Sequence, residues 1–411
     1  MMILAVIASA AAQVGPGFDP VAATDAYLAL VDAAARAKSD TYFEGTYWLI
    51  LWNAVVGVVV AWGLLQAGVV ARLSQTADRW ARGRKALRAF LFSLIYLAIT
   101  GVLTLPWSLY VGWAREQHYG MSNQTLAAWL GEWSIATVIG TLLGAAGLLA
   151  ILTLYRKLPR SWWAWGTLAS GIFLLIGLLL SPVFIEPLFN RYTPMPASPL
   201  RTQMLQMAQA NGVPADNVLV VDASRQTKRI SANVAGIGPT VRVALNDNLL
   251  NQTSPAEVRA VMGHELGHYV LGHTATLLIG FTLIAGLFLL VIDRATPWLV
   301  ARFGARWGIG SRNDPAMLVP ATIVISVLGV LLTPVTNSLI RFHERQADYF
   351  GINASRAPDG WARVALKLGA YRKLNPSPLE EIVFFDHPSG HTRILMAMQW
   401  KAHHSGEPDL Q

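Results

Sequence analysis

The sequence predicts a mainly α-helical, polytopic membrane protein: a helical bundle or barrel that carries a polar domain with a small β-sheet. Of the 411 residues, 54% are hydrophobic and only 14% are charged, whereas soluble domains are about 25% charged. The mean hydropathy is +0.41. Apolar residues come in long blocks without heptads or Gly-X-Y periods, which excludes coiled coils, collagen and disordered chains.

Six blocks are long and apolar enough to cross a bilayer, which takes roughly 20 helical residues. Tryptophan and tyrosine gather at their ends, as expected for side chains at the membrane interface. The predicted spans are Tyr47–Ala71, Ala89–Trp113, Trp133–Tyr155, Trp162–Phe184, Ala275–Val300 and Ala316–Ile340.

These spans divide the chain into five parts. Residues 1–46 form an N-terminal segment, residues 47–188 a membrane domain of four spans, and residues 275–340 a two-span hairpin. Residues 189–274 and 341–411 are polar enough to face water. Within the first part, Met1–Ala12 ends in small residues that resemble a signal-peptide cleavage region. The alternative is a short, embedded first helix.

The first polar segment contains a helical stretch, two β-like runs and an amphipathic helix. The helical stretch is Ser198–Asn211, and the β-like runs are Val218–Asp222 and Val241–Leu245. The amphipathic helix begins near Ser254, where serine caps and Pro255 takes the first helical position.

The net charge and the absence of cysteine limit which ligands and binding partners the protein can have. Without cysteine there are no disulfides and no thiolate metal ligands. A net charge of +8 is compatible with nucleic-acid binding, but most of the positive charges flank hydrophobic spans. We therefore expect membrane lipids as partners and no nucleic acid.

His264-Glu265-Leu266-Gly267-His268, an H-E-x-x-H motif, lies inside the amphipathic helix. A spacing of four puts both imidazoles on one helical face, so both can bind a single zinc ion. Glu265 then projects beside the metal, where it can take a proton from the attacking water. The alternative is a pair of satisfied histidines on a structural helix.

A catalytic zinc needs a third protein ligand, and Glu344 is the best candidate. Two predicted spans separate it from His268, so the chain returns to the same membrane face. Asp348 lies four residues on, where it can accept the other ring N–H of a ligand histidine. The alternative for Glu344 is a solvated charge that pairs with Arg341 or Arg345.

Together these motifs resemble the type I CAAX prenyl proteases, the a-factor-converting zinc endopeptidases of membranes. The resemblance covers roughly Leu105 to Arg393 and includes several motifs in the same order. Besides the zinc helix, which extends to Gly272-His273, these are Leu105-Pro106-Trp107-Ser108-Leu109-Tyr110, His118-Tyr119-Gly120, Phe184-Ile185-Glu186-Pro187, Val221-Asp222-Ala223-Ser224-Arg225 and Asp386-His387-Pro388.

The resemblance implies a gluzincin-type zinc metalloprotease domain, with residues 189–274 and 341–411 as its two parts. The implied zinc ligands are His264, His268 and Glu344, with Glu265 as general base. Asp348 and His273 are then expected beside these ligands.

Three further roles come from the resemblance. Asn233 is expected to hold the substrate backbone as an added strand, for which Val241–Leu245 is a candidate edge. His387 is expected to stabilise the oxyanion and Arg393 to orient substrate. Without the resemblance, His387 is better explained as a turn-capping residue before Pro388.

This chain departs from the family pattern at two places. It has Asn233-Val234-Ala235 where the family usually has Asn-Ala-Tyr, so the substrate strand is expected to be read differently. The family's first full membrane helix is missing or reduced to Met1–Ala12, whereas the family encloses a seven-helix chamber.

The resemblance implies hydrolysis of a peptide or protein substrate, with or without an attached lipid. The implied reaction removes the C-terminal tripeptide next to a prenylated cysteine. A general quality-control metalloprotease of the related heat-shock type is the alternative. A rival from another class is a catalytically silent membrane scaffold, which has no need of Glu265.

The distribution of positive charge predicts the sidedness of the protein. Basic residues are concentrated in the loops after the first, third and fifth spans, and these loops lie on one side. The positive-inside rule places that side in the cytoplasm and the zinc motifs outside it, whereas the resemblance implies the cytosolic face. The basic residues are Arg72, Arg79, Arg82, Arg84, Lys85, Arg88, Arg156, Lys157, Arg160, Arg294, Arg302, Arg306 and Arg312.

Overall fold

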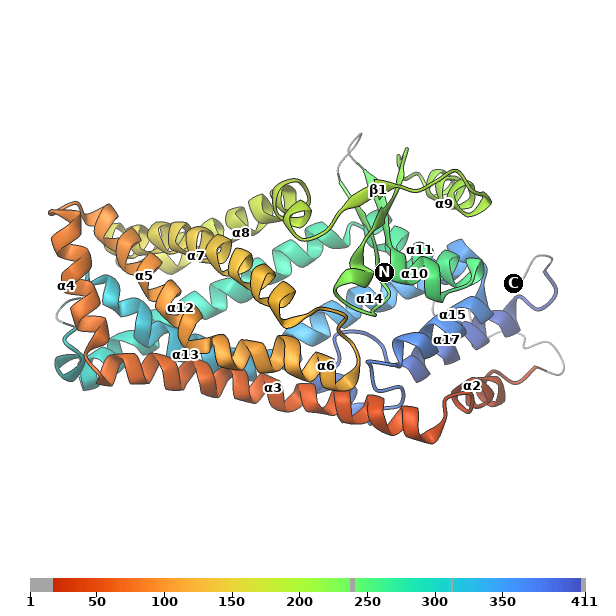
Figure 1. Cartoon of the computed structure of the whole chain (residues 1–411), viewed down its shortest axis with the longest axis horizontal. Helices are drawn as coiled ribbons and strands as arrows, with labels where there is room; N and C mark the ends of the chain where they lie inside the picture. Colours follow the sequence, from red (N-terminus) through yellow and green to blue (C-terminus); the bar gives the residue numbers. More distant parts are fainter. Residues whose placement is uncertain (1–17, 237–240, 310, 312, 408–411) are drawn as a thin grey trace.

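The computed structural model describes residues 18–236, 241–309, 311 and 313–407. The predicted signal peptide or short helix at Met1–Ala12 lies outside these residues. Long helices run along the longest axis of the molecule, and the sheet with most of the shorter helices lies toward one end (Figure 1). The mainly helical fold predicted from the sequence is confirmed.

Five helical segments in the described part of the chain are long and apolar enough to span a membrane. The first is α3 (Ala33–Gln66), and the fourth is α8 (Trp162–Leu180) with its short continuation to Leu188. The second runs through α5 (Lys85–Leu109), a π-helical turn (Tyr110–Ala114) and α6 (Arg115–Tyr119). The others are α7 (Leu126–Lys157) and α12 (His273–Trp307).

The first span begins and ends earlier than predicted. Its first residue is Ala33 rather than Tyr47, because the side chain of Asp32 caps the helix by accepting from the N–H of Ala35. The helix ends at Gln66, and Gly68 adopts a left-handed conformation that starts α4 (Val69–Ala81) in a new direction.

The predicted span Ala316–Ile340 is not one straight helix. The short turn Pro315–Met317 and α13 (Leu318–Leu331) meet α14 (Thr333–Ser355) at a bend of 54°. Pro334, in the first turn of α14, has no N–H to continue the hydrogen-bond ladder of α13. The pair makes a sixth span if it is counted as one broken segment.

A four-stranded sheet lies in the polar part, in the order β1-β2-β4-β3. The predicted runs Val218–Asp222 and Val241–Leu245 correspond to β2 (Val218–Val221) and β4 (Arg242–Asn246), which pair in parallel. Sequence reasoning missed β1 (Tyr192–Pro194) and β3 (Ala232–Ala235), which are too short to show alternation.

This order corrects the prediction about the free edge. The run Val241–Leu245 was the candidate edge, but β4 lies between β2 and β3, so both of its sides are paired. The edge strand next to β4 is β3, which pairs antiparallel with β4 and places Asn233 opposite Ala244. It also lies beside α11 (Pro255–Val270), the helix of the H-E-x-x-H motif.

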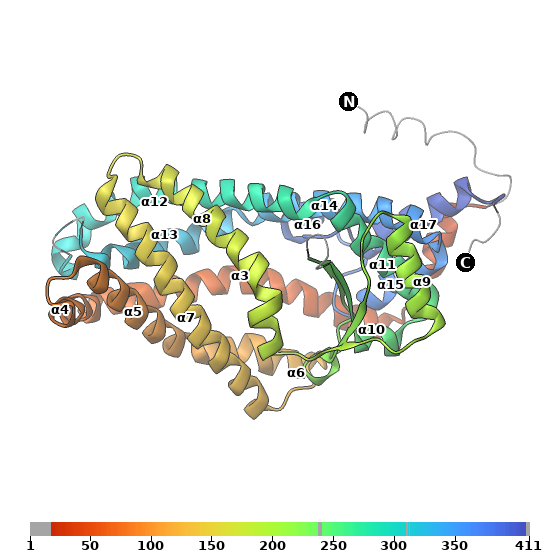
Figure 2. The same cartoon turned by 90° about the horizontal axis from the view of Figure 1, so that it is seen from above.

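Helices complete the polar part around one core, which contains the buried side chains of Met204, Leu245, Met262 and Ile352. Figure 2 shows these helices at the end opposite α4. They are α2 (Pro20–Leu28), α9 (Pro199–Ala210), α10 (Asp247–Gln252), α15 (Pro358–Leu368), α16 (Pro378–Phe384) and α17 (Gly390–His403).

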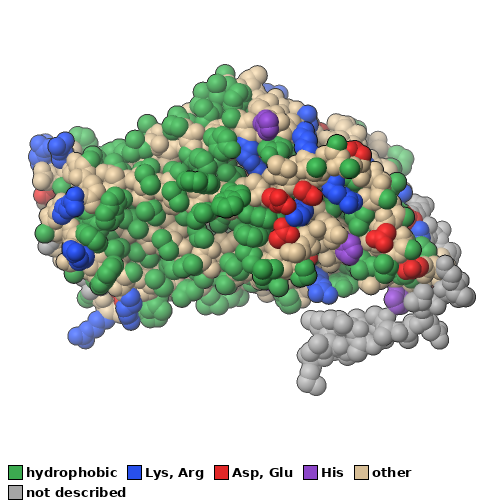
Figure 3. All heavy atoms as spheres, turned by 90° about the horizontal axis from the view of Figure 1, so that it is seen from below, with side chains coloured by type: hydrophobic (Ala, Val, Ile, Leu, Met, Phe, Trp, Pro, Cys, Tyr) green, Lys and Arg blue, Asp and Glu red, His purple; other side chains and the backbone are tan. Residues whose placement is uncertain are grey.

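Charge and apolar surface separate along the long axis. On the face drawn in Figure 3, hydrophobic side chains cover the middle of the molecule, and lysine and arginine side chains stand at the end that carries α4. The turns between α7 and α8 and between α12 and α13 lie at that same end (Figure 1). The surface is therefore that of a membrane bundle with a basic end and a polar domain at the other end.

Candidate active site

The motif helix α11 starts at a complete capping box. Ser254 Oγ accepts from the N–H of Glu257 at 3.4 Å, and Glu257 Oε2 accepts from the N–H of Ser254 at 2.6 Å. Val258, Met262 and Leu266 are buried in the core. This packing fixes the rotation of α11, so that its histidines and Glu265 project from another face.

Helices α11 and α14 touch along their backbones. A Cβ atom added at Gly263 would lie 2.5 Å from the carbonyl oxygen of Gly351, and one at Gly351 would lie 2.6 Å from the backbone nitrogen of His264. Any larger side chain at either position would therefore separate the helices. This contact brings Glu344 and Asp348 of α14 next to the two histidines of α11.

The three predicted ligands converge on one point. His264 Nε2 lies 3.1 Å from His268 Nε2 and 3.1 Å from Glu344 Oε2, and His268 Nε2 lies 3.3 Å from Glu344 Oε1. Ligand atoms around a tetrahedral zinc with bonds of about 2.0–2.2 Å are about 3.3–3.6 Å apart. The spacing of the donor atoms therefore fits one zinc ion.

The outer hydrogen bonds of the histidines support the same fit. His264 Nδ1 lies 2.8 Å from Asp348 Oδ1, an acceptor that draws the ring proton to Nδ1. His268 Nδ1 lies 3.0 Å from His273 Nδ1, and His273 Nε2 lies 3.1 Å from Gln346 Oε1. With protons on both Nδ1 atoms, the two Nε2 lone pairs face each other beside a carboxylate, which a cation would stabilise.

Charge around α11 also favours a cation. Burial alone would lower the pKa of His264, but the carboxylates of Asp348 and Glu344 outweigh it and raise that pKa to about 10. Burial raises the pKa of Glu265, the predicted base on the same helix. A raised carboxyl pKa suits a group that must accept a proton near neutral pH.

Arg393, on α17, contacts the carboxylates behind the ligands. Its Nε donates to Asp348 Oδ2 at 2.9 Å and its Nη2 to Glu344 Oε2 at 3.3 Å. Burial alone would lower the pKa of Arg393, and Asp348 and Glu344 raise it. In this arrangement the guanidinium orients both carboxylates, and its predicted contact with substrate stays a prediction.

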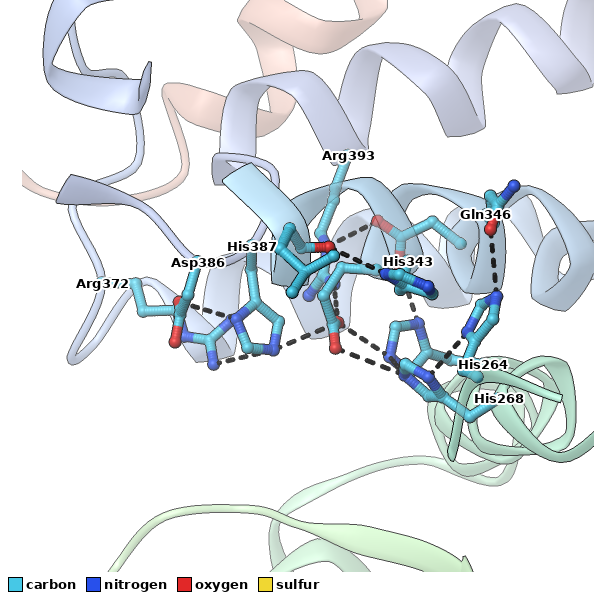
Figure 4. Close-up of polar contacts among 12 residues, drawn as sticks. His264, His268, His343, Gln346, Arg372, Asp386, His387 and Arg393 are labelled. Atoms are coloured by element: carbon cyan, nitrogen blue, oxygen red, sulfur yellow. Dashed lines mark hydrogen bonds and ion pairs between the residues drawn. The ribbon is translucent and has the colours of Figure 1, made fainter. Parts of the chain in front are cut away.

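His387 lies beside Asp386 and Arg372, away from His264 and His268 (Figure 4). Its Nδ1 is 2.7 Å from Asp386 Oδ1, its Nε2 is 3.1 Å from Glu344 Oε2, and Arg372 Nη2 is 3.5 Å from the same Nε2. Burial lowers the pKa of His387, Asp386 opposes this shift, and Arg372 adds to it. The ring is therefore within reach of an oxygen that forms next to the metal.

Asn233 is exposed on the edge strand β3, and its side chain makes no hydrogen bond to the other predicted site residues in the described part of the chain. Two residues of the cluster, Gln346 and Arg372, were missed by sequence reasoning. Gln346 lies between Glu344 and Asp348 on α14, so its position in the sequence could have indicated that it belongs to the site. Arg372 lies in an irregular segment between α15 and α16, where no pattern marked it.

Comparison with known proteins adds two family matches. Residues 194–401 match Peptidase family M48, and residues 23–191 match the family described as "CAAX prenyl protease N-terminal, five membrane helices". Within residues 23–191 the described structure has four helical segments of spanning length and the shorter α4.

Comparison with individual proteins also points to membrane metalloproteases. The chain is 29% identical to "Uncharacterized metalloprotease YhfN" of Bacillus subtilis, over 83% of this chain and 81% of that protein. It is 26% identical to "CAAX prenyl protease 1" of Saccharomyces cerevisiae, over 72% of this chain and 70% of that protein. The crystal structure of S. mikatae Ste24p superposes with a TM-score of 0.73 at 20% identity, covering 90% and 89% of the two chains.

The family predicted from the motifs is confirmed, and the heat-shock-type alternative is not favoured. The structural superposition supports the fold, and the sequence matches support the peptidase assignment. The chain belongs to peptidase family M48 and is a multi-pass membrane metallopeptidase related to the CAAX prenyl proteases.

Proposed function

We propose that this protein is a zinc endopeptidase in which His264, His268 and Glu344 hold one zinc ion and Glu265 is the general base. The convergence of the three donor atoms, all within 4.8 Å of one another, carries the proposal. Zinc, when bound, polarises the scissile carbonyl and lowers the pKa of a water molecule. Residues 189–274 and 341–411 then form one catalytic unit, joined by the hairpin 275–340.

The side chains have separate tasks in peptide hydrolysis. Glu265 accepts a proton from the attacking water, whose oxygen adds to the carbonyl carbon. His387 lies where it can donate to the resulting oxyanion. When the C–N bond breaks, Glu265 returns the proton to the leaving amine. Asp348 and His273 hold the ligand histidines in the required tautomers.

The proposed substrate is a peptide with a prenylated cysteine, from which the C-terminal tripeptide is removed. The names of several relatives, such as "CAAX prenyl protease 1", support this class. Membrane lipids surround the apolar band of the bundle. We propose no nucleic-acid partner, because most of the positive charges flank the hydrophobic spans.

One peptide assayed with and without a farnesyl group tests the substrate class. We expect kcat/KM to be at least about 10-fold higher for the farnesylated peptide, since each buried methylene contributes about 0.8 kcal/mol. Glu265→Ala protein is the blank, and mass spectrometry identifies the released tripeptide. Equal cleavage of both peptides would support peptide hydrolysis but contradict a specificity for the lipid. That result would favour a quality-control protease.

Asn233 is proposed to bind the substrate backbone at the free edge of β3. We expect Asn233→Ala to lower kcat/KM up to about 10-fold, the loss of about one hydrogen bond, without loss of zinc. Asn251→Ala, an exposed asparagine on α10, is the matched control. If kcat/KM and zinc content were the same in both variants, Asn233 would have no role in binding substrate.

The distribution of basic side chains along the molecule supports a proposal for its sidedness. The basic turns lie at the end that carries α4, whereas α11, with the H-E-x-x-H motif, lies in the other half of the molecule (Figures 1 and 2). We propose that the basic end faces the cytoplasm and the catalytic domain faces away from it. A reporter active only in the cytoplasm should work when inserted between Arg72 and Arg88 and be silent after Gln411. The reverse pattern would return the protein to the cytosolic orientation implied by its resemblance.

A further inference from the structure

Arg372 is the one cation of the described active-site cluster that lacks a carboxylate partner. Its Nη2 lies 3.5 Å from His387 Nε2, and no ion pair joins it to a carboxylate in the described part of the chain. Arg393, in contrast, contacts both Asp348 and Glu344. The positive charge of Arg393 is therefore paired within the protein, whereas Arg372 interacts with Asp386 and Glu344 only at longer range, without an ion pair.

The segment that carries Arg372 is anchored on both sides. Ser39 Oγ of α3 donates to the carbonyl oxygen of Arg372 at 3.3 Å and also to that of Gly369. The next residue, Lys373, makes ion pairs with Glu44 at 2.6 Å and with Glu380 at 2.9 Å. These contacts hold the backbone while the guanidinium points at His387 (Figure 4).

The environment of the guanidinium disfavours an unmatched charge. Burial lowers the pKa of Arg372 and the neighbouring Arg393 lowers it further, and the opposing effects of Asp386 and Glu344 do not restore it. Guanidinium groups stay protonated in proteins, so burying this charge costs free energy. An anion that binds next to Arg372 would recover part of that free energy. A peptide substrate brings two candidates: its C-terminal carboxylate, and the oxyanion that forms at the scissile carbonyl.

Distances favour the oxyanion. Arg372 Nη2 is 3.5 Å from a ring nitrogen that is itself 3.1 Å from Glu344 Oε2, a proposed zinc ligand. His387 Nε2 therefore stands between the guanidinium and Glu344, so an oxyanion that forms beside His387 is the nearest anion that a substrate brings to Arg372. The carboxylate of a released tripeptide would lie about 10 Å from the scissile carbonyl, at about 3.3–3.6 Å per extended residue.

We propose that Arg372 is a catalytic residue, a second donor that stabilises the oxyanion together with His387. This inference rests on the proposed zinc-peptidase function. Arginine has only donors on its side chain, so it can donate whichever tautomer His387 adopts. It makes no ion pair in the described resting site and gains one when the oxyanion forms, which stabilises the transition state more than the bound substrate.

Arg372→Met tests the proposal, with Arg363→Met, an exposed arginine on α15, as the matched control. We expect kcat to fall about 10²–10³-fold with KM nearly unchanged, as on loss of one oxyanion donor. Zinc content and melting temperature should stay at the wild-type values. Arg372→Lys keeps the charge without the planar fork and should recover part of kcat. Arg363→Met should behave as wild type.

A phosphinic peptide, whose tetrahedral phosphorus mimics the oxyanion, gives a second readout without turnover. Its affinity for zinc-loaded protein should fall by the same factor as kcat/KM, whereas an uncleavable reduced-amide peptide should bind equally to wild type and Arg372→Met. An unchanged kcat would overturn the inference. So would a KM that rises only for peptides with a free C-terminal carboxylate and not for their amides, because that pattern assigns Arg372 to the carboxylate.

Failure of the underlying function gives a different result. Wild-type protein that binds neither zinc nor the phosphinic peptide would overturn the proposed zinc-peptidase function, and this inference with it. Active wild-type protein with an equally active Arg372→Met variant would overturn the role of Arg372 alone.

Discussion

Glu265→Ala abolishes peptide hydrolysis and leaves the proposed zinc site loaded: this is the expected result for the general base. Glu265 lies between two ligands on α11, but it is not among the three residues whose donor atoms converge. Its removal takes away the group that accepts the proton of the attacking water. The loss of a general base lowers the rate by about 10²–10⁴-fold, so turnover should fall close to the detection limit.

The measurement combines zinc analysis with a peptide assay on the same sample. Glu265→Gln keeps the size of the side chain and removes its charge, so it should be as inactive as Glu265→Ala. Glu407→Gln, at an exposed position after α17, is the matched control and should stay active. An active Glu265→Ala variant would remove the base assignment. Wild-type protein that binds zinc but cleaves no peptide would favour the silent scaffold.

Local sequence patterns were sufficient to predict those parts of the site whose residues are neighbours in the sequence. The two histidines and Glu265 lie within five positions of one helix, and Ser254 and Pro255 marked the start of that helix. Glu344 was accessible from topology, because two spans return the chain to the same face. His387 was accessible only through family resemblance, since an Asp-His-Pro turn has no chemical signature of its own.

Other features depend on contacts between helices that are distant in the sequence. The close approach of Gly263 and Gly351 joins α11 and α14, and each glycine alone resembles an ordinary helix position. The pairing of Arg393 with Asp348 and Glu344 needs α17 to lie across α14. The segment after Pro315 is also mainly apolar along its length, so its hydropathy could not indicate where the 54° bend lies.

The second large effect is expected at Glu344, the ligand that comes from α14. Glu344→Ala removes one of three protein donors and leaves Arg393 facing the two histidines with one carboxylate fewer. Both changes weaken the attraction for a dication. Loss of an outer contact to a ligand costs about 10–100-fold in metal affinity, and loss of a ligand itself should cost more. We therefore expect metal-free, inactive protein.

Zinc titration against a competing chelator measures the effect, and two variants of the same helix calibrate it. Asp348→Asn keeps all three ligands and alters only the hydrogen bond to His264, so it should show the smaller loss of affinity. Arg345→Gln, at an exposed position beside Glu344, should bind zinc as wild type does. Comparing Glu344→Ala with Glu265→Ala then distinguishes the roles of the two carboxylates, because the first variant should lose the metal and the second should lose only turnover. If Glu265→Ala lost zinc while Glu344→Ala kept both zinc and activity, the roles of ligand and base would have to be exchanged.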